Sequence, residues 1–311
     1  MSELAIHHVT AICGQPQPNL DFYAGTLGMR FVKRTVNFDD PTAYHFYYGD
    51  WAGSPGTLVT FFPYLGGRPG ITGVGMATSL RIEAPEDAPT FWADRLAAQG
   101  VSFGETTLGD APVFAFEDPD GMMVELVFSG ISPAIDPYAA TGVAKHRALG
   151  AVHSVELSVD NFDATESLLV DTMGFRLIED QGERRRYQAP QSDRASLIDV
   201  RCCPEAQVGR VALGSIHHVA FRVKDAESQL EWRAKLVDLG YHVSPVMNRD
   251  YFKSIYFREP GGTLFEFATD GPGMDIDEPI ESLGDALRLP QQYEPYRGRI
   301  ESALPPITIP R

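Results

Sequence analysis

Two nearly identical stretches stand far apart in the chain: IHHVTAI at residues 6–12 and IHHVAFRV at residues 216–223. Weaker copies follow the same pattern, MATSLRI at residues 76–82 and VHSVELSV at residues 152–159. Each stretch is short and rich in β-branched and other apolar residues, which predicts a strand. Self-similarity of this kind indicates that one supersecondary unit is repeated along the chain.

A segment with apolar residues at helical spacing follows each predicted strand, so we expect helices over residues 19–27, 88–98, 162–173 and 226–239. A glycine then stops each helix, and a further strand is expected directly after it, in LGMRFV, QGVSF, MGFRLI and LGYHV. The turns DPDG at residues 118–121 and EPGG at residues 259–262 predict hairpins that lead into a last strand. The unit is therefore β-α-β-β-β, and it is present four times.

The predicted modules cover residues 1–65, 74–130, 148–204 and 213–270, separated by segments rich in Gly, Pro or small residues. Modules 1 and 2 make the N-terminal half of the chain, and modules 3 and 4 make the C-terminal half. The proline-containing tail over residues 271–311 is expected to be a C-terminal wrap or lid with little regular structure, and a frayed terminus is the alternative.

Composition excludes several classes of protein. Among 311 residues, 43% are hydrophobic and 22% charged, as in an ordinary globular chain. The formal net charge of −16 repels phosphate backbones and anionic lipid, so we expect neither a nucleic-acid nor a membrane partner. The chain has no long apolar run, no leader-like start and only three cysteines without a CxxC pair, which together predict a cytoplasmic protein. A homo-oligomer is compatible with the sequence.

The strongest chemical signal combines the two IHHV strands with a carboxylate, Glu266, in the apolar strand FEF. Burying an acid between two phenylalanines is costly unless a metal or another cation compensates it. Because side chains alternate along a strand, only one histidine of each HH pair is expected to face a given cavity. Two neutral imidazoles and one carboxylate form a facial triad with open positions, the pattern of non-haem Fe(II) and oxygen chemistry.

These repeats, the IHHV strands and the FEF strand resemble the vicinal oxygen chelate superfamily, which includes glyoxalases, bleomycin resistance proteins and extradiol dioxygenases. Within it, the chain is similar to the four-module ring-cleaving dioxygenases of the hydroquinone dioxygenase type. The resemblance includes DDPTAYHFYYGDWAGSPGTLVTFFP at residues 39–63 and LPP at residues 304–306. It implies an α+β fold, in which four βαβββ modules pair into two open, strongly curved mixed β-sheet barrels.

The resemblance also implies a site between modules 1 and 4, with Fe(II), or alternatively Mn(II), bound by His8, His218 and Glu266. Residues that flank the metal and the substrate in the family match His7, Thr10, His217, Arg249 and Tyr256.

In modules 2 and 3, Ala77 and Ser154 take the places of the two histidines, although Glu125 remains in VEL. We therefore expect one metal site per chain. Glu125 is expected to pair with an arginine or to lie in a wet cavity, and His153 to be a structural strand residue. His45, in AYHFYY, either faces the active cavity or packs as a polar core residue.

The function that the resemblance implies is an Fe(II)-dependent extradiol-type dioxygenase that opens a hydroquinone or catechol ring with both atoms of O2. Its partners would be a small aromatic diol and O2. A glyoxalase-like metal-dependent isomerase or thiol transferase is one alternative, but such enzymes usually need a fourth protein ligand, and module 1 offers Thr60 at that place. The other alternative is a non-catalytic aromatic-binding or resistance protein, which would need no metal ligands.

Overall fold

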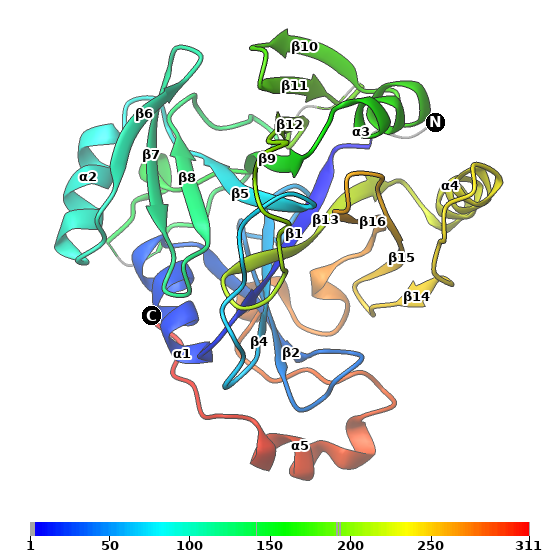
Figure 1. Cartoon of the computed structure of the whole chain (residues 1–311). Helices are drawn as coiled ribbons and strands as arrows, with labels where there is room; N and C mark the ends of the chain where they lie inside the picture. The colour runs from blue at the N-terminus through cyan, green and yellow to red at the C-terminus, as the bar shows by residue number, and fades with distance from the viewer. Residues whose placement is uncertain (1–3, 141, 191, 193, 311) are drawn as a thin grey trace.

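The computed structural model describes residues 4–140, 142–190, 192 and 194–310, and its strands form two eight-stranded sheets (Figure 1). The first sheet has the spatial order β14 (Met247–Asn248), β15 (Phe252–Arg258), β16 (Leu264–Pro272), β13 (Ser215–Val223), β1 (Ile6–Cys13), β4 (Leu58–Pro63), β3 (Tyr44–Gly49) and β2 (Arg30–Val36). The second sheet has the order β10 (Arg176–Asp180), β11 (Arg184–Gln188), β12 (Leu197–Cys202), β9 (Val152–Val159), β5 (Met76–Glu83), β8 (Met123–Val127), β7 (Ala111–Glu117) and β6 (Gly104–Leu108).

One pairing rule generates both sheets. In every repeat the first strand lies parallel to the last: β1 with β4, β5 with β8, β9 with β12 and β13 with β16. The first strands of two repeats then pair antiparallel, β1 with β13 and β5 with β9. The first and last repeats therefore share one curved half-barrel, and the middle two share the other, which confirms the predicted α+β fold.

Helices follow the first strands, as predicted, but two of them change from α-helical to π-helical hydrogen bonding. They are α1 (Pro16–Leu20), α2 (Pro89–Ala98), α3 (Asp163–Ser167) and α4 (Ala226–Asp238), with π-helical turns at Asp21–Thr26 and Leu168–Thr172 after α1 and α3. Apolar spacing predicts a helical segment but does not distinguish i→i+4 from i→i+5 hydrogen bonding. The glycines expected to stop the helices, Gly28, Gly100, Gly174 and Gly240, all have the positive φ that this role requires.

The prediction of a strand directly after Gly240 is wrong. Tyr241 and Val243 pack against the core, but the chain forms ladder hydrogen bonds only from Met247. The segment between them lies at the edge of the sheet, where Ser244 donates one backbone hydrogen bond to Tyr256. A short, irregular edge is a common way to avoid an open strand.

Alternation along the strands separates the core from the site. Val9, Phe265 and Phe267 are fully buried in the main apolar cluster, and the Phe267 ring lies 5.3 Å from that of Trp232 in α4. His8 and Glu266, their neighbours in sequence, therefore belong to the other face of the sheet.

The described part of the tail reaches residue 310, and it packs Ile300 and Leu304 into the main apolar cluster. It contains more regular structure than expected: helix α5 (Arg297–Ala303) and short 3-10 turns at Met274–Ile276, Ile280–Ser282 and Glu294–Tyr296, besides the turn at Lys145–Arg147 earlier in the chain. In Figure 1 the tail runs past the first half-barrel and ends near α1. Leu287 bridges to Arg34 of the edge strand β2, and the Tyr44 hydroxyl donates to the carbonyl of Pro305.

Across the described residues, no helix is both long enough and apolar enough to cross a bilayer.

Candidate metal centre

Three adjacent strands bring His8, His218 and Glu266 together. Antiparallel β1 and β13 supply the histidines, and β16, parallel to β13, supplies the carboxylate. The two Nε2 atoms lie 3.2 Å apart, and Glu266 Oε2 lies 2.9 Å from His218 Nε2 and 3.4 Å from His8 Nε2. All three side chains are buried, and their ligand atoms lie within 4.8 Å of one another.

Two β-bulges place the neighbouring histidines beside these ligands. Ile6 and His8 pair with consecutive residues of β13, so His7 is an extra residue in β1. Thr10 and Ala11 pair with His218 and Ile216, so His217 is an extra residue in β13. The Nδ1 atoms of His7 and His8 lie 2.9 Å apart, and those of His217 and His218 lie 2.8 Å apart. The strict alternation expected within each HH pair does not hold, because a bulged residue has no ladder partner that fixes its side. As expected, however, one histidine of each pair, His8 and His218, lines the cavity at the triad.

The histidine contacts determine the tautomers that a metal ligand needs. If Nε2 of His8 and of His218 is free to bind a metal, Nδ1 carries the proton and donates it to Nδ1 of His7 or His217. Burial lowers the pKa of His218 and lowers that of His217 to about 3, so both rings are neutral near pH 7. Burial alone would raise the pKa of Glu266, but His8 and His218 outweigh it and hold that pKa well below its usual range.

The residues fit a divalent metal ion. Ser254 donates to Oε1 of Glu266, but within the described part of the chain the buried Oε2 accepts no hydrogen bond. A buried, unpartnered carboxylate oxygen is costly unless a cation compensates it. Metal–ligand bonds of about 2.1 Å at right angles would separate ligand atoms by about 3 Å, which is close to the three distances observed.

A cavity of about 30 Å³ opens on this triad. Arg249 and Tyr256 lie on its wall: the Arg249 guanidinium is 3.0 Å from the Asp39 carboxylate, and its Nε donates to the Tyr256 hydroxyl at 3.3 Å. The cavity has room for water but not for an aromatic ring. A ring can enter only if part of the wall moves, and the side chain of Asp39 is 64% exposed.

The other sequence-predicted residue, Thr10, is buried and hydrogen-bonded to Thr60 at 2.7 Å. The cavity is also lined by Tyr47, Phe62, Phe252 and Asp39, which the sequence did not single out. Of the two places that the sequence allows for His45, the structure shows the cavity wall. Alternation in YHFYYG puts His45 and Tyr47 on one face and was the signal available for Tyr47.

Strand register identifies the counterparts of the triad in the second half-barrel. The bulge in β5 falls between Ala77 and Ser79, as that in β1 falls between Ile6 and His8. Ser79, and not Ala77 as predicted, therefore takes the place of His8, because the predicted alignment did not allow for the bulge. Ser154 matches His218 as predicted.

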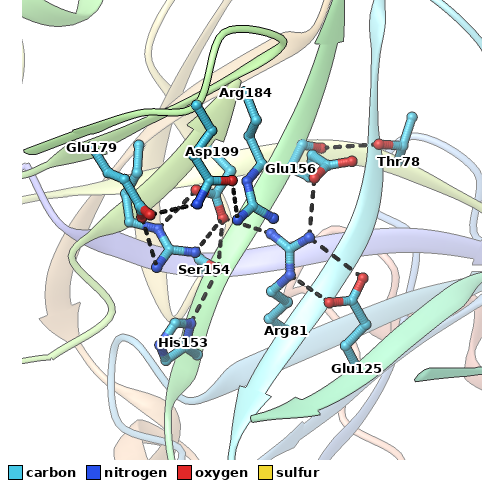
Figure 2. Close-up of polar contacts among 11 residues, drawn as sticks. Thr78, Arg81, Glu125, His153, Ser154, Glu156, Glu179, Arg184 and Asp199 are labelled. Carbon is cyan, nitrogen blue, oxygen red and sulfur yellow. Dashed lines mark hydrogen bonds and ion pairs between the residues drawn. The ribbon is translucent and has the colours of Figure 1, made fainter. Parts of the chain in front are cut away.

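An arginine supplies the positive charge in that second half-barrel. Figure 2 shows the guanidinium of Arg81 among three carboxylates: it lies 2.6 Å from Asp199 and 3.0 Å from Glu156, and it also pairs with Glu125. Asp199 faces Glu156 across the ladder as Glu266 faces Ala220, so it is the counterpart of Glu266. The predicted pairing of Glu125 with an arginine is confirmed. Within the described ranges, His8, His218 and Glu266 form the only cluster with metal-binding geometry.

Comparison with known proteins agrees with this geometry. Residues 5–126 and 151–267 match the family model of the Glyoxalase/Bleomycin resistance protein/Dioxygenase superfamily. The chain belongs to this superfamily. Among superfamily relatives, it is 40% identical over 306 residues to MhqO of Bacillus subtilis (strain 168), named as a proposed ring-cleaving dioxygenase, covering 98% of this chain and 97% of that protein.

A second superfamily relative is the chlorohydroquinone/hydroquinone 1,2-dioxygenase of Sphingobium indicum, 31% identical over 296 residues, with 93% of this chain and 92% of that protein covered. Among solved structures, a proposed dioxygenase from Bacillus subtilis superposes with a TM-score of 0.95 at 40% identity, covering 99% of this chain and 98% of that chain. Glyoxalase I from Zea mays, with a TM-score of 0.64 at 15% identity, covers 86% of this chain and 93% of that chain, and shares the fold.

Proposed function

We propose that this protein is an Fe(II)-dependent, extradiol-type dioxygenase that opens the ring of a hydroquinone or a catechol with O2. The observation that carries the proposal is the convergence of His8, His218 and Glu266 on one buried point beside a cavity. The names of the relatives, ring-cleaving and hydroquinone dioxygenases, support the same reaction class.

Two histidines and one carboxylate on one face favour Fe(II), with Mn(II) as the alternative, because this triad leaves positions open for two further ligands. When bound, the metal would supply a common binding place for a ring hydroxyl and O2 and a route for electrons from the ring to oxygen. In the overall reaction a carbon–carbon bond of the ring breaks, and both oxygen atoms enter the product.

The chain's own residues would position and shield the substrate. Burial raises the pKa of Tyr256, so its hydroxyl keeps its proton and can donate a hydrogen bond to a substrate oxygen. Arg249 is held between Asp39 and that hydroxyl, where its charge would stabilise an anionic oxygen. The Phe252 ring, 5.1 Å from that of His8, excludes water from the ligand side.

Thr60 weighs against the glyoxalase-like alternative. Its hydroxyl is hydrogen-bonded to Thr10 at 2.7 Å and lies 3.0 Å from His45 Nε2, so it is committed to a network of module 1. A neutral hydroxyl is also a poor substitute for the carboxylate ligand that a fourth coordination position would need. The non-catalytic binding alternative is separated from the dioxygenase by experiment.

The test is anaerobic reconstitution with Fe(II), followed by O2 uptake with hydroquinone, methylhydroquinone and catechol. We expect O2 consumption together with the absorbance of a ring-opened product, and loss of both in His218→Ala. Glu266→Gln is expected to lose bound iron and turnover, whereas Glu125→Gln, the same substitution at a strand carboxylate of the other half-barrel, should keep the iron content of the wild type.

Full iron content and full turnover in Glu266→Gln would refute the triad. Wild-type protein that binds iron but consumes no O2 with any of the three diols would favour the isomerase. Metal-free folded protein that binds a diol as tightly as the iron-loaded protein would favour the non-catalytic binder. The cytoplasmic location, the absence of nucleic-acid and membrane partners, the oligomeric state and the module boundaries stay predictions.

A further inference from the structure

Module 1 contains a counterpart of Tyr256. In the last hairpin of module 4, Tyr256 pairs with Glu266; in that of module 1, Tyr47 pairs with Thr60. Strands β4 and β16 are the parallel neighbours of β1 and β13, so the two tyrosines hold equivalent positions in the two repeats. Both line the cavity at the triad, one from each module.

A neighbouring side chain forms a hydrogen bond with each tyrosine hydroxyl and orients it. Arg249 donates to the hydroxyl of Tyr256, and the hydroxyl of Tyr47 lies 2.9 Å from His45 Nδ1. The network continues from His45 Nε2 to Thr60 at 3.0 Å and from Thr60 to Thr10 at 2.7 Å. All of its members are buried, so the hydroxyl of Tyr47 has a fixed direction rather than a solvated one.

This network carries one more polar hydrogen than it has contacts to fill. Tyr47, neutral His45, Thr60 and Thr10 each carry one polar hydrogen, four in total, but only three contacts join them. One hydrogen is therefore left over, at the Thr10 end or at the Tyr47 end. When His45 donates from Nδ1 to Tyr47, the leftover hydrogen is that of Tyr47, whose residue lines the cavity. A ligand oxygen beside Tyr47 would complete the network.

We propose that Tyr47, oriented by His45, binds a second hydroxyl of the substrate, remote from the one at the metal, and so selects 1,4-diols over 1,2-diols. The inference rests on the proposed function. In a 1,2-diol both oxygens lie at one end of the ring and would both approach the triad and Tyr256. In a 1,4-diol the second oxygen lies across the ring, where a donor contributed by the opposite module can reach it.

The test measures anaerobic binding of hydroquinone and of catechol to the iron-loaded protein by calorimetry, and the steady-state constants of O2 uptake. Loss of one hydrogen bond in Tyr47→Phe is expected to weaken hydroquinone binding and raise its KM about fivefold, because such a bond contributes about 1 kcal/mol. The constants for catechol should change less than about twofold. Tyr48→Phe is the matched control, because Tyr48 is a buried neighbour in the same strand whose hydroxyl donates to Asn19 instead.

His45→Phe removes the support of Tyr47 without touching the tyrosine. It should weaken hydroquinone binding in the same direction, and the double variant should bind no more weakly than Tyr47→Phe alone. This variant also keeps the proposal testable if Tyr47→Phe fails to fold.

Unchanged hydroquinone binding in Tyr47→Phe, while wild type consumes O2, would overturn this inference and leave the proposed function intact. Equal losses for hydroquinone and catechol would also overturn it, because they would show a general packing effect. Absence of O2 uptake by the wild type would instead overturn the proposed function, and the binding data would still decide the role of Tyr47.

Discussion

At the scale of one residue, Glu266 has two properties of a functional position. Its burial costs folding free energy, and hydrogen bonds from the protein compensate that cost only in part. Phe265 and Phe267 belong to the core, so the strand must be buried, and the carboxylate is buried with it. Ser254 bonds one oxygen and the other faces two imidazoles. Departures from local rules of this kind are expected mainly at functional sites.

Ser254 should control how well Glu266 binds metal. Ser254→Ala removes the hydrogen bond that fixes the carboxylate, and loss of such a supporting contact lowers metal affinity by about 10- to 100-fold. Competition with a coloured chelator measures the change. The exposed Ser302→Ala should leave affinity unchanged, and a Ser254→Ala protein with wild-type affinity would contradict the prediction.

His153 should make stability depend on pH. Burial, with a smaller contribution from Arg186, lowers its pKa to about 4. Between that value and the ordinary pKa of about 6.5, the unfolded chain binds a proton that the folded chain does not, so stability is lost as pH falls through this window, by up to about 1.4 kcal/mol per pH unit. Urea unfolding of metal-free wild type and His153→Gln checks this, because the variant should show the shallower acid loss; parallel profiles would refute it.

At the scale of the element, one strand pair provides two different centres. The bulged pair β1 and β13 presents two histidines to Glu266, and the bulged pair β5 and β9 carries serines at the matching positions, of which Ser154 contacts Asp199 at 3.4 Å. The second pair adds Arg81, which carries the charge that a metal would carry in the first. The same backbone therefore supports either a metal or an ion-pair cluster, according to the side chains at a few positions.

Arg81 should be essential for the second half-barrel to fold. Arg81→Met removes the cation that pairs with Glu156 and Glu125 and leaves Asp199 with Arg186 as its cationic partner, and breaking such a buried pair costs about 3–5 kcal/mol. The denaturant midpoint should fall accordingly, while protein that remains folded should bind one metal as before. Arg176→Met, at an exposed site in the same sheet, is the control; equal midpoints for the two variants would contradict the ion-pair role.

At the scale of the whole molecule, the tail fastens the edge of the first half-barrel and one corner of the site. Lys33 is fully buried, and its ammonium group lies 2.6 Å from Asp277 and 2.6 Å from Glu278. Asp277 also accepts a hydrogen bond from the hydroxyl of Tyr251, which is next to Phe252 in the cavity wall. Asp277 thus connects the tail to the segment that forms part of the cavity wall.

Lys33→Met should release the tail. The change leaves the buried Glu278 with Arg288, 3.5 Å away, as its cationic partner, so the cost should lie toward the lower end of about 3–5 kcal/mol, and limited proteolysis should then cut within residues 271–310 before any other segment. Arg297→Met removes ion pairs with the exposed Glu294 and Glu301 and one hydrogen bond to the carbonyl of Leu287, all within the tail, and should cost less than the loss of Lys33. Tail cleavage at the same rate in the two variants would contradict this assignment.

Much of this architecture could be predicted from sequence because it depends on periodicity. The repeated strands and the glycine stops predicted the β-α-β-β-β unit, and the IHHV and FEF strands predicted a site of two histidines and Glu266. The resemblance to the superfamily implied that these histidines are His8 and His218 and that the modules pair into two curved sheets. The predictions failed where a local pattern does not encode strand register. A bulge makes Ser79, and not Ala77, the counterpart of His8, and bulges also determine the side of the strand on which His7 and His217 lie. The strand predicted directly after Gly240 is absent, and pairing begins at Met247.

The sequence alone determined which residue types are present and how they alternate, since side-chain period and backbone preference are local properties. Only the tertiary structure decided which of them meet. Pairing of β1 with β13 joins residues 210 positions apart, and the same packing places His45 and Tyr47 on the cavity and Arg81 among three carboxylates. Such contacts depend on strand register and sheet curvature, which are set by the packing of all sixteen strands together.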